Sequence, residues 1–261
     1  MDTEKIVEAS VESIVGLIPA FAGLTGNPLW IAPATIIAPF IQKQINEVAQ
    51  WSLGILQRKK VDCCTKLMSE AMAVKIKNGE SPRKDSFFEC KYNSQIETYE
   101  SSASKLIEGA LLKTKEEYDS KKIPFISFFT ANVLFTPNLS ESKAFVLLEI
   151  LNKLTYRQLC ALAIFHQRKI LKIGAWESQL KAIIGLQDYY DVAYEFISLK
   201  DLLLIEQQMP NGRPGMGIGI QDYRISALGQ ELYITANLAA IDQQDLSTLN
   251  SMVDYVSSFM K

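Results

Sequence analysis

Residues 13–42 constrain the fold more than any other part of the chain, because they contain no Asp, Glu, Lys or Arg. Glu12 precedes this charge-free stretch and Lys43 follows it, whereas charges recur at ordinary intervals elsewhere. Contiguous apolar surface of this size is rarely left in water. The stretch must therefore be buried in the protein itself, in a partner or in a bilayer.

Prolines and glycines divide the charge-free stretch into shorter pieces. An interior proline removes a backbone donor and clashes with the preceding helical turn. Asn27 is suited to cap a helix and Pro28 to its first turn. The pattern predicts an apolar helical hairpin of residues 13–24 and 28–42, each piece shorter than the ~20 residues of a membrane-spanning helix. A core hairpin, a membrane element and a partner interface all fit this pattern.

We expect the large apolar side chains of the stretch to make the membrane or partner contact. These residues are Leu17, Phe21, Leu29, Trp30, Ile36, Ile37 and Phe40. A basic flank follows on the next predicted helix and consists of Arg58, Lys59 and Lys60. Such charges gain about 1 kcal/mol each near an anionic membrane surface. The alternative for this flank is an ordinary solvated helix face.

Composition limits the class of protein. The chain has 261 residues, 48% of them apolar, which is enough for one large or two small domains with a core. Its net charge of −2 gives no basic footprint for nucleic acid. The four cysteines form no CxxC pair, and the chain has a single histidine, so we expect neither a zinc site nor a cofactor. Reduced, mostly buried thiols in a cytosolic protein fit best, and the first residues do not resemble a signal peptide.

Helical periodicity dominates the chain up to residue 165. One predicted helix ends at Asn78-Gly79, and the polar residues 80–88 read as a loop and a domain boundary. Further helices are predicted over residues 90–122, 125–135, 138–151 and 155–165. Thr155 and Gln158 have the spacing of a capping box. Because apolar residues surround the helix that follows this box, we expect it to lie at the centre of a core.

The last third of the chain has a different pattern. Helical residues 176–205 are followed by turns, by two short strands drawn from Ile218, Ile220, Tyr223 and Ile225, and by helices 227–238 and 245–260. Two helices and a two-stranded ribbon form the outline of a winged helix, placed at about residues 155–240. The C-terminal helix has an apolar face that packs either on this domain or on a second copy.

Four segments carry a resemblance to a known family. They are residues 104–118, 122–125, 154–160 and 225–233, which together lie within about residues 100–235. In these segments the chain resembles the abortive-infection alpha family of bacterial helical proteins. The resemblance implies a bacterial protein acting in phage defence. Its motifs are packing motifs, so it carries over no catalytic residue.

The remaining motifs do not predict a reaction. His166 lies on an apolar helix without a recognisable nucleophile, and the glycines at 215, 217 and 219 lack the strand and helix of a phosphate-binding loop. The vicinal Cys63-Cys64 pair is interpreted as structural, because reactivity requires a lowered pKa. The helix before the ribbon has one lysine, Lys200, among several carboxylates, which would repel DNA. We therefore predict no catalytic residue and no nucleic-acid binding.

Together these observations predict a mainly α-helical protein. We expect an N-terminal helical region, residues 1–79, that carries the apolar hairpin. A helical core with a degenerate winged-helix part and a C-terminal helix follows, residues 90–261. The predicted function is non-enzymatic membrane association or binding of a protein partner or a second copy, in the cytoplasm or peripheral to the inner membrane. The alternatives are a soluble winged-helix transcription regulator and a structural subunit of a larger complex.

Overall fold

The structure, a computed structural model, describes Ile37, Phe40, Lys43 and residues 51–168, 171–172, 187–208 and 222–258. The described chain is mainly α-helical with two small sheets, as the sequence predicts. It forms two compact units that divide between Asn152 and Lys153. We call them unit 1 and unit 2.

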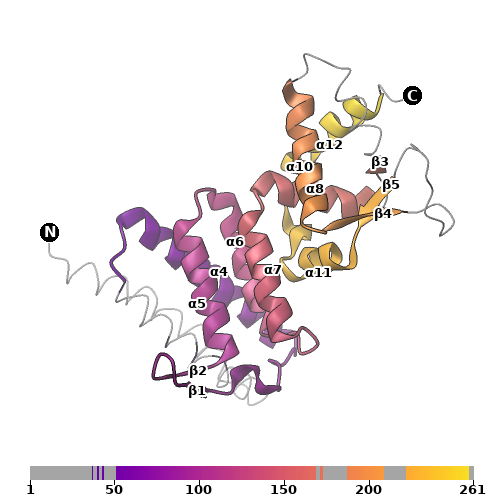
Figure 1. Ribbon diagram of the computed structural model, residues 1–261. Coiled ribbons are helices and arrows are strands. Elements are labelled where there is room, and N and C mark those ends of the chain that lie inside the picture. The colour runs from indigo at the N-terminus through magenta and orange to yellow at the C-terminus, as the bar shows by residue number, and fades with distance from the viewer. Residues whose placement is uncertain are drawn as a thin grey trace. The chain divides into compact units, whose positions relative to one another are not determined.

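Unit 1 is a helical bundle with one small hairpin. Its described helices and strands are α4 (Ile55–Lys77), β1 (Lys91–Asn93), β2 (Thr98–Glu100), α5 (Ser102–Glu116), α6 (Ile123–Val133) and α7 (Glu141–Lys153). Helix α4 packs along α5 and α6 (Figure 1). Their facing side chains form the core, and the largest fully buried ones include Met68, Met72, Leu106, Ile107, Leu111, Ile126 and Phe129.

Local sequence signals set several boundaries in unit 1. Helix α4 ends at Lys77 with Asn78 as its C-cap, and Gly79 follows with a φ of +83°, a conformation that suits glycine. The hydroxyl of Ser101 accepts a hydrogen bond from the Ser104 backbone N–H and so caps α5. Helix α6 has Pro124 in its first turn and overlaps the core helix predicted over residues 125–135, but it begins two residues earlier.

Two predictions about unit 1 differ from the structure. The helix expected over residues 90–122 is wrong at its start, because β1 and β2 pair as an antiparallel hairpin before α5 begins. The polar residues 80–89 do not separate two domains, since α4 on one side packs on α5 and α6 on the other. Arg83 holds this segment in place: it is buried, and its backbone N–H donates to the Leu134 carbonyl at 3.0 Å.

Unit 2 surrounds one central helix. Its described elements are α8 (Tyr156–Arg168), β3 (Leu171–Lys172), α10 (Gln187–Asp201), β4 (Ile205–Gln208), β5 (Asp222–Ile225), α11 (Ala227–Thr235) and α12 (Gln243–Ser258). Helix α8 contacts α10, α11, α12 and β5. The three strands pair antiparallel in the order β3-β5-β4.

The start of α8 confirms the predicted capping box. The Gln158 backbone N–H donates to the Thr155 hydroxyl at 3.1 Å, and the Thr155 N–H donates to the Gln158 side chain at 2.9 Å. Every residue from Gln158 to Phe165 is buried, so α8 is the central helix that its apolar sequence predicts. Strand β5 contains the predicted Tyr223 and Ile225, whereas residues 218 and 220 lie outside the described residues.

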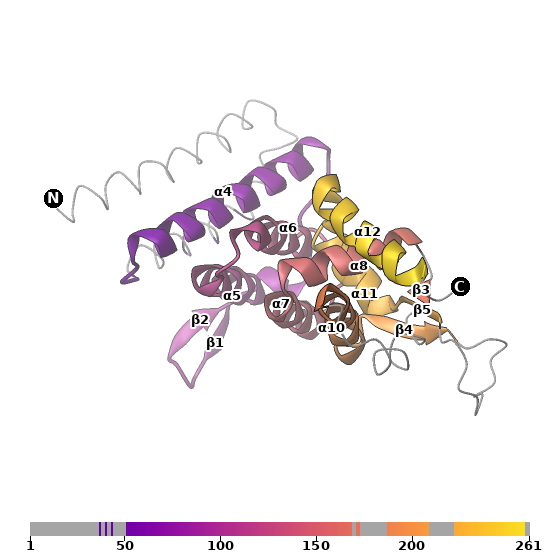
Figure 2. The ribbon, with the colours of Figure 1, turned by 90° about the horizontal axis from the view of Figure 1, so that it is seen from above.

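Seen from above, the β1–β2 hairpin projects from the helices of unit 1 (Figure 2). Among the helices that the structure describes, none combines the length and the apolar character needed to cross a bilayer.

Candidate functional site

The described end of the charge-free stretch lies against unit 1. Ile37 is completely buried, and the Phe40 ring packs on Phe88 with centroids 5.2 Å apart and an interplanar angle of 55°. The other predicted contact residues lie outside the described residues, namely Leu17, Phe21, Leu29, Trp30 and Ile36. Membrane or partner contact through Ile37 and Phe40 therefore requires their release from this arrangement.

Lys43 marks where charge returns after the stretch, and it reaches the hairpin. Its ammonium group donates to the Tyr99 carbonyl on β2 at 3.4 Å. The stretch thus ends beside two neighbouring parts of unit 1, the 3-10 turn Ser86–Phe88 and the β1–β2 hairpin. We call Phe40, Phe88 and this lysine contact the docking point of the stretch.

The docking point rests on a fixed segment. Phe88 contacts Phe87, which is buried under the Arg83 guanidinium at 4.0 Å from the ring centroid. Arg83 forms a two-pronged ion pair with Asp85, with Nε 2.8 Å from Oδ1 and Nη2 2.5 Å from Oδ2. Hydrogen bonds from Arg83 lower the pKa of the Asp85 carboxyl. The segment that receives Phe40 is therefore held by buried and charge-assisted contacts.

The basic flank lies on the first turns of α4, and only part of it is exposed for contact with a membrane or a partner. Lys59 is exposed, whereas Arg58 and Lys60 are partly buried. Lys60 donates to the Glu117 carbonyl at the end of α5, and Glu117 in turn pairs with the buried Lys122. One of the three predicted basic residues thus serves the interior of unit 1. Arg58 lies near Asp62, whose pKa is raised by burial against the opposing effect of Arg58.

Apolar side chains are exposed beside this basic flank. Ile55 and Leu56, at the start of α4, are 80% and 66% exposed, and Tyr118 after α5 is 82% exposed. The Lys115 ammonium lies 5.6 Å from the centroid of Trp51. Large apolar groups next to lysines are typical of surfaces that meet a membrane interface.

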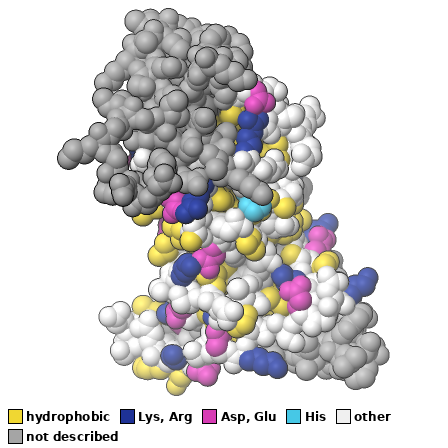
Figure 3. All heavy atoms as spheres, turned by 90° about the vertical axis from the view of Figure 1, so that its right-hand side faces the viewer, with side chains coloured by type: hydrophobic (Ala, Val, Ile, Leu, Met, Phe, Trp, Pro, Cys, Tyr) yellow, Lys and Arg dark blue, Asp and Glu magenta, His cyan; other side chains and the backbone are white. Residues whose placement is uncertain are grey.

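The described surface of unit 2 has no excess of positive charge. Arg224 on β5 pairs with Glu206 on β4 at 2.7 Å, and Lys200 lies over the Tyr223 ring. By sequence, α10 carries four carboxylates and one lysine. Figure 3 shows acidic and basic side chains interspersed over the described part of one face. These charges oppose binding to a polyanion.

His166 has a structural environment in unit 2. Its imidazole Nδ1 lies 2.9 Å from the Gln230 side-chain oxygen, and the ring stacks on Tyr233 at 3.8 Å. The four cysteines form no disulfide: Cys64 and Cys160 are buried, as predicted for most of them, but Cys63 and Cys90 are exposed. Burial raises the pKa of the Cys64 thiol, which disfavours the reactive thiolate. The described residues contain no cluster of His, Cys, Asp and Glu side chains that could hold a metal ion.

The sequence pattern identified the charge-free stretch but not the residues that Phe40 and Lys43 contact, Phe88 and Tyr99. Phe88 was placed in the loop segment, and Tyr92 and Tyr99 in the expected helix. The alternation of polar residues around Tyr92 and around Tyr99 is a weak strand signal that could have identified the hairpin.

No protein-family model, curated protein or solved structure gives a significant match to the chain.

Proposed function

We propose that this is a non-enzymatic membrane-associating protein that holds Ile37 and Phe40, near the end of its charge-free stretch, in unit 1 and releases the stretch to an anionic bilayer. The observation that carries the proposal is the docking point. Thirty residues without a charge end there, at a ring contact between Phe40 and Phe88 and a 3.4 Å hydrogen bond from Lys43.

The free energies of the contacts involved favour an arrangement from which the stretch can be released. An aromatic pair contributes about 0.5–1.5 kcal/mol beyond its area burial. Transfer of one Leu, Ile or Phe side chain out of water gains about 1.5–3 kcal/mol. Ile37 is already buried, so its transfer to a bilayer gains little. The gain comes from side chains of the stretch that enter the bilayer from water, and it has to exceed the loss of the Phe40–Phe88 contact.

The start of α4 supports a membrane surface as the partner. Ile55, Leu56 and Lys59 are exposed there, shortly after the stretch ends. Apolar side chains can enter the interfacial layer while the lysine meets lipid phosphates. The basic flank thus contributes mainly through Lys59, since Lys60 is engaged inside unit 1.

Flotation with vesicles of phosphatidylcholine and phosphatidylglycerol tests this proposal. We expect the full-length protein to float and the double variant Leu17→Asp/Phe21→Asp to lose at least about tenfold in binding, because a charge in the bilayer centre costs about 2.5–3.5 kcal/mol. The control is Ser142→Asp/Ser247→Asp, which adds the same charge at exposed positions of α7 and α12. Wild-type protein that never floats, or a double variant that floats like the control, contradicts the proposal.

For unit 2 we infer a degenerate winged helix that binds a protein. Its described order of helix, strand, helix and two further strands, with β5 between β3 and β4, supports that architecture. The acidic α10 and the paired Arg224 argue for a protein partner in place of DNA. The transcription-regulator alternative requires a mobility shift on duplex DNA that weakens steeply with salt, and we expect no such shift.

The resemblance to the abortive-infection alpha family supplies a biological setting. In phage defence, release of the stretch would couple a signal received by unit 2 to the membrane. We propose this setting as a hypothesis, and it predicts that host cells lose phage protection when the stretch carries Leu17→Asp/Phe21→Asp.

A further inference from the structure

The β1–β2 hairpin exposes an aromatic face that the stability of unit 1 does not explain. Tyr92 and Tyr99 stand directly opposite each other across the two strands, with ring centroids 5.2 Å apart. They are 56% and 63% exposed, and Ile96 in the turn is 57% exposed. Three large side chains are therefore presented to solvent by ten residues of chain.

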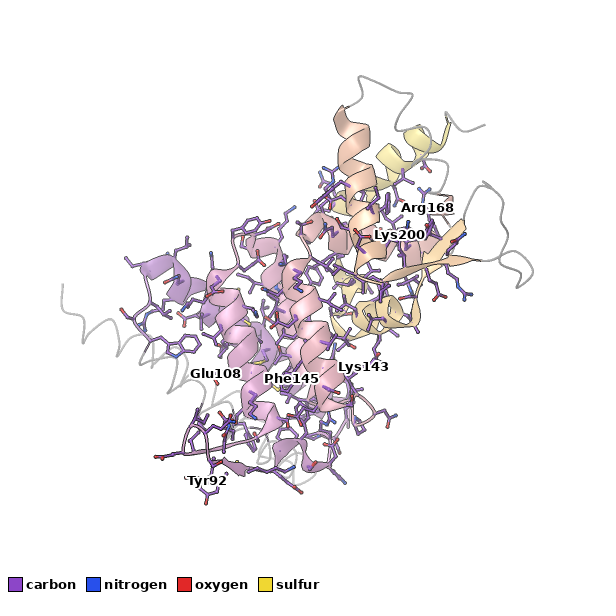
Figure 4. All side chains as sticks on the ribbon, viewed as in Figure 1. Tyr92, Glu108, Lys143, Phe145, Arg168 and Lys200 are labelled. Carbon is purple, nitrogen blue, oxygen red and sulfur yellow. The ribbon has the colours of Figure 1, made fainter. Side chains whose placement is uncertain are left out.

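The other face of the hairpin fixes its position. The Asn93 amide donates to the Glu100 carboxylate at 3.3 Å, and Glu100 pairs with Lys105 of α5 at 3.2 Å. Hydrogen bonding from Asn93 lowers the pKa of Glu100. Tyr92, together with polar side chains of the hairpin and of the starts of α5 and α7, lines a cavity of about 340 Å³. The polar face thus turns toward the helices, and Figure 4 shows Tyr92 at the outer side of the hairpin.

The hairpin lies where the charge-free stretch ends. Lys43 donates to the carbonyl of Tyr99 itself, and Phe40 packs on Phe88, three residues before β1. Any surface that accepts the stretch is therefore brought close to the tyrosine face. Tyrosine is enriched at membrane–water interfaces, because its ring is apolar and its hydroxyl can stay hydrated.

We propose that Tyr92, Tyr99 and Ile96 form a second membrane contact, which enters the interfacial layer of the bilayer that receives the stretch. This inference rests on the proposed function. Exposed Glu97 in the turn stays among the head groups, which limits the contact to the interface. The hairpin then anchors unit 1 at the surface while the stretch inserts.

An environment-sensitive fluorophore at the turn tests this contact. The variant Ile96→Cys, in a Cys63→Ser/Cys90→Ser background, is labelled with nitrobenzoxadiazole and mixed with the same anionic vesicles. Cys64 and Cys160 are buried and stay unlabelled. We expect a blue shift and at least a twofold rise in emission, whereas a label at exposed Ser247→Cys on α12 stays unchanged.

A second variant separates the hairpin from the stretch. Tyr92→Ser/Tyr99→Ser should weaken vesicle binding about three- to tenfold, while Tyr194→Ser, which removes an exposed tyrosine of unit 2, leaves binding as in the wild type. Suppose that the wild type floats, but the emission of the label at Ile96→Cys does not change and Tyr92→Ser/Tyr99→Ser binds like the wild type. This result overturns the hairpin contact and leaves the proposed function standing. Absence of wild-type flotation overturns both proposals. If the emission of the label shifts with protein concentration in the absence of vesicles, the hairpin contacts a second copy of the protein. That result overturns the membrane contact.

Discussion

At the scale of single residues, Gly229 lies so close to the backbone of Leu204 that no larger residue fits at this position. A Cβ atom at this position would lie 2.1 Å from the Leu204 carbonyl oxygen and 2.9 Å from Ile225 Cγ1. The Ser226 backbone N–H donates to the same Leu204 carbonyl at 3.0 Å, and the Ser226 hydroxyl caps α11. Glycine allows the start of α11 to approach the turn before β4.

We expect Gly229→Ala to destabilise the protein by about 1–3 kcal/mol, because the contact is with backbone that cannot move aside cheaply. The matched control is Gly109→Ala within α5, where the added methyl group meets only the flexible Leu148 side chain at 3.4 Å. This control should be neutral or stabilising by up to about 1 kcal/mol through helix propensity. Urea unfolding measures both, and an unchanged midpoint for Gly229→Ala would show that α11 does not pack as described.

At the scale of elements, residues 83–88 before β1 are fixed to the helices of unit 1 and do not form a flexible linker. We call these residues the strap. Arg83 donates through Nη1 to the Val133 carbonyl at the end of α6, pairs with Asp85 and covers Phe87. The strap thereby holds Phe88 in the position where Phe40 packs. Loss of these contacts would therefore also displace Phe88 and weaken the docking point of the stretch.

The strap predicts a pH dependence of stability. The carboxyl of Asp85 has a lowered pKa in the folded state, and its unfolded pKa is about 3.9. The ion pair therefore stabilises the fold fully above the unfolded pKa, and this contribution is lost as pH falls through the lower folded pKa. Asp85→Asn should be less stable than wild type at pH 7, and the difference should shrink by pH 2.5 in urea titrations. Lys84→Gln, an exposed neighbour, should follow the wild-type profile, and a constant difference for Asp85→Asn would refute this role.

Local signals explain which elements the sequence could predict. Asn78-Gly79, the Thr155/Gln158 box and the apolar run of α8 are short-range features, and the structure contains the helix boundaries they indicate. The three-residue strands β1 and β2 each show a single polar–aromatic–polar alternation, which is too short to outweigh the helical pattern of the residues that follow, so a helix was predicted there. Strand β4 was not predicted: it begins at Ile205, the last residue of the helix predicted over residues 176–205.

The candidate site could be predicted only on one side. Ile37 and Phe40 stand out by their position in an uncharged run, whereas Phe88 is one aromatic residue in a polar segment. Their contact joins residues 48 positions apart (88 minus 40), and no local pattern specifies such a pair. The buried role of Lys60 was hidden likewise, because its partner Glu117 lies on another helix boundary.

At the scale of the whole molecule, we propose that membrane binding requires the charge-free stretch to leave its docking point. A reversible lock tests it: Phe40→Cys/Phe88→Cys in the Cys63→Ser/Cys90→Ser background, oxidised through a bis-methanethiosulfonate cross-linker that bridges thiols too far apart for a direct disulfide. We expect the locked protein to stay with the soluble fraction in vesicle flotation and to float once a reductant opens the bond. The single variant Phe40→Cys in the same background should float under both conditions. Equal flotation of the oxidised and reduced double variant would contradict the claim, because binding would then need no release.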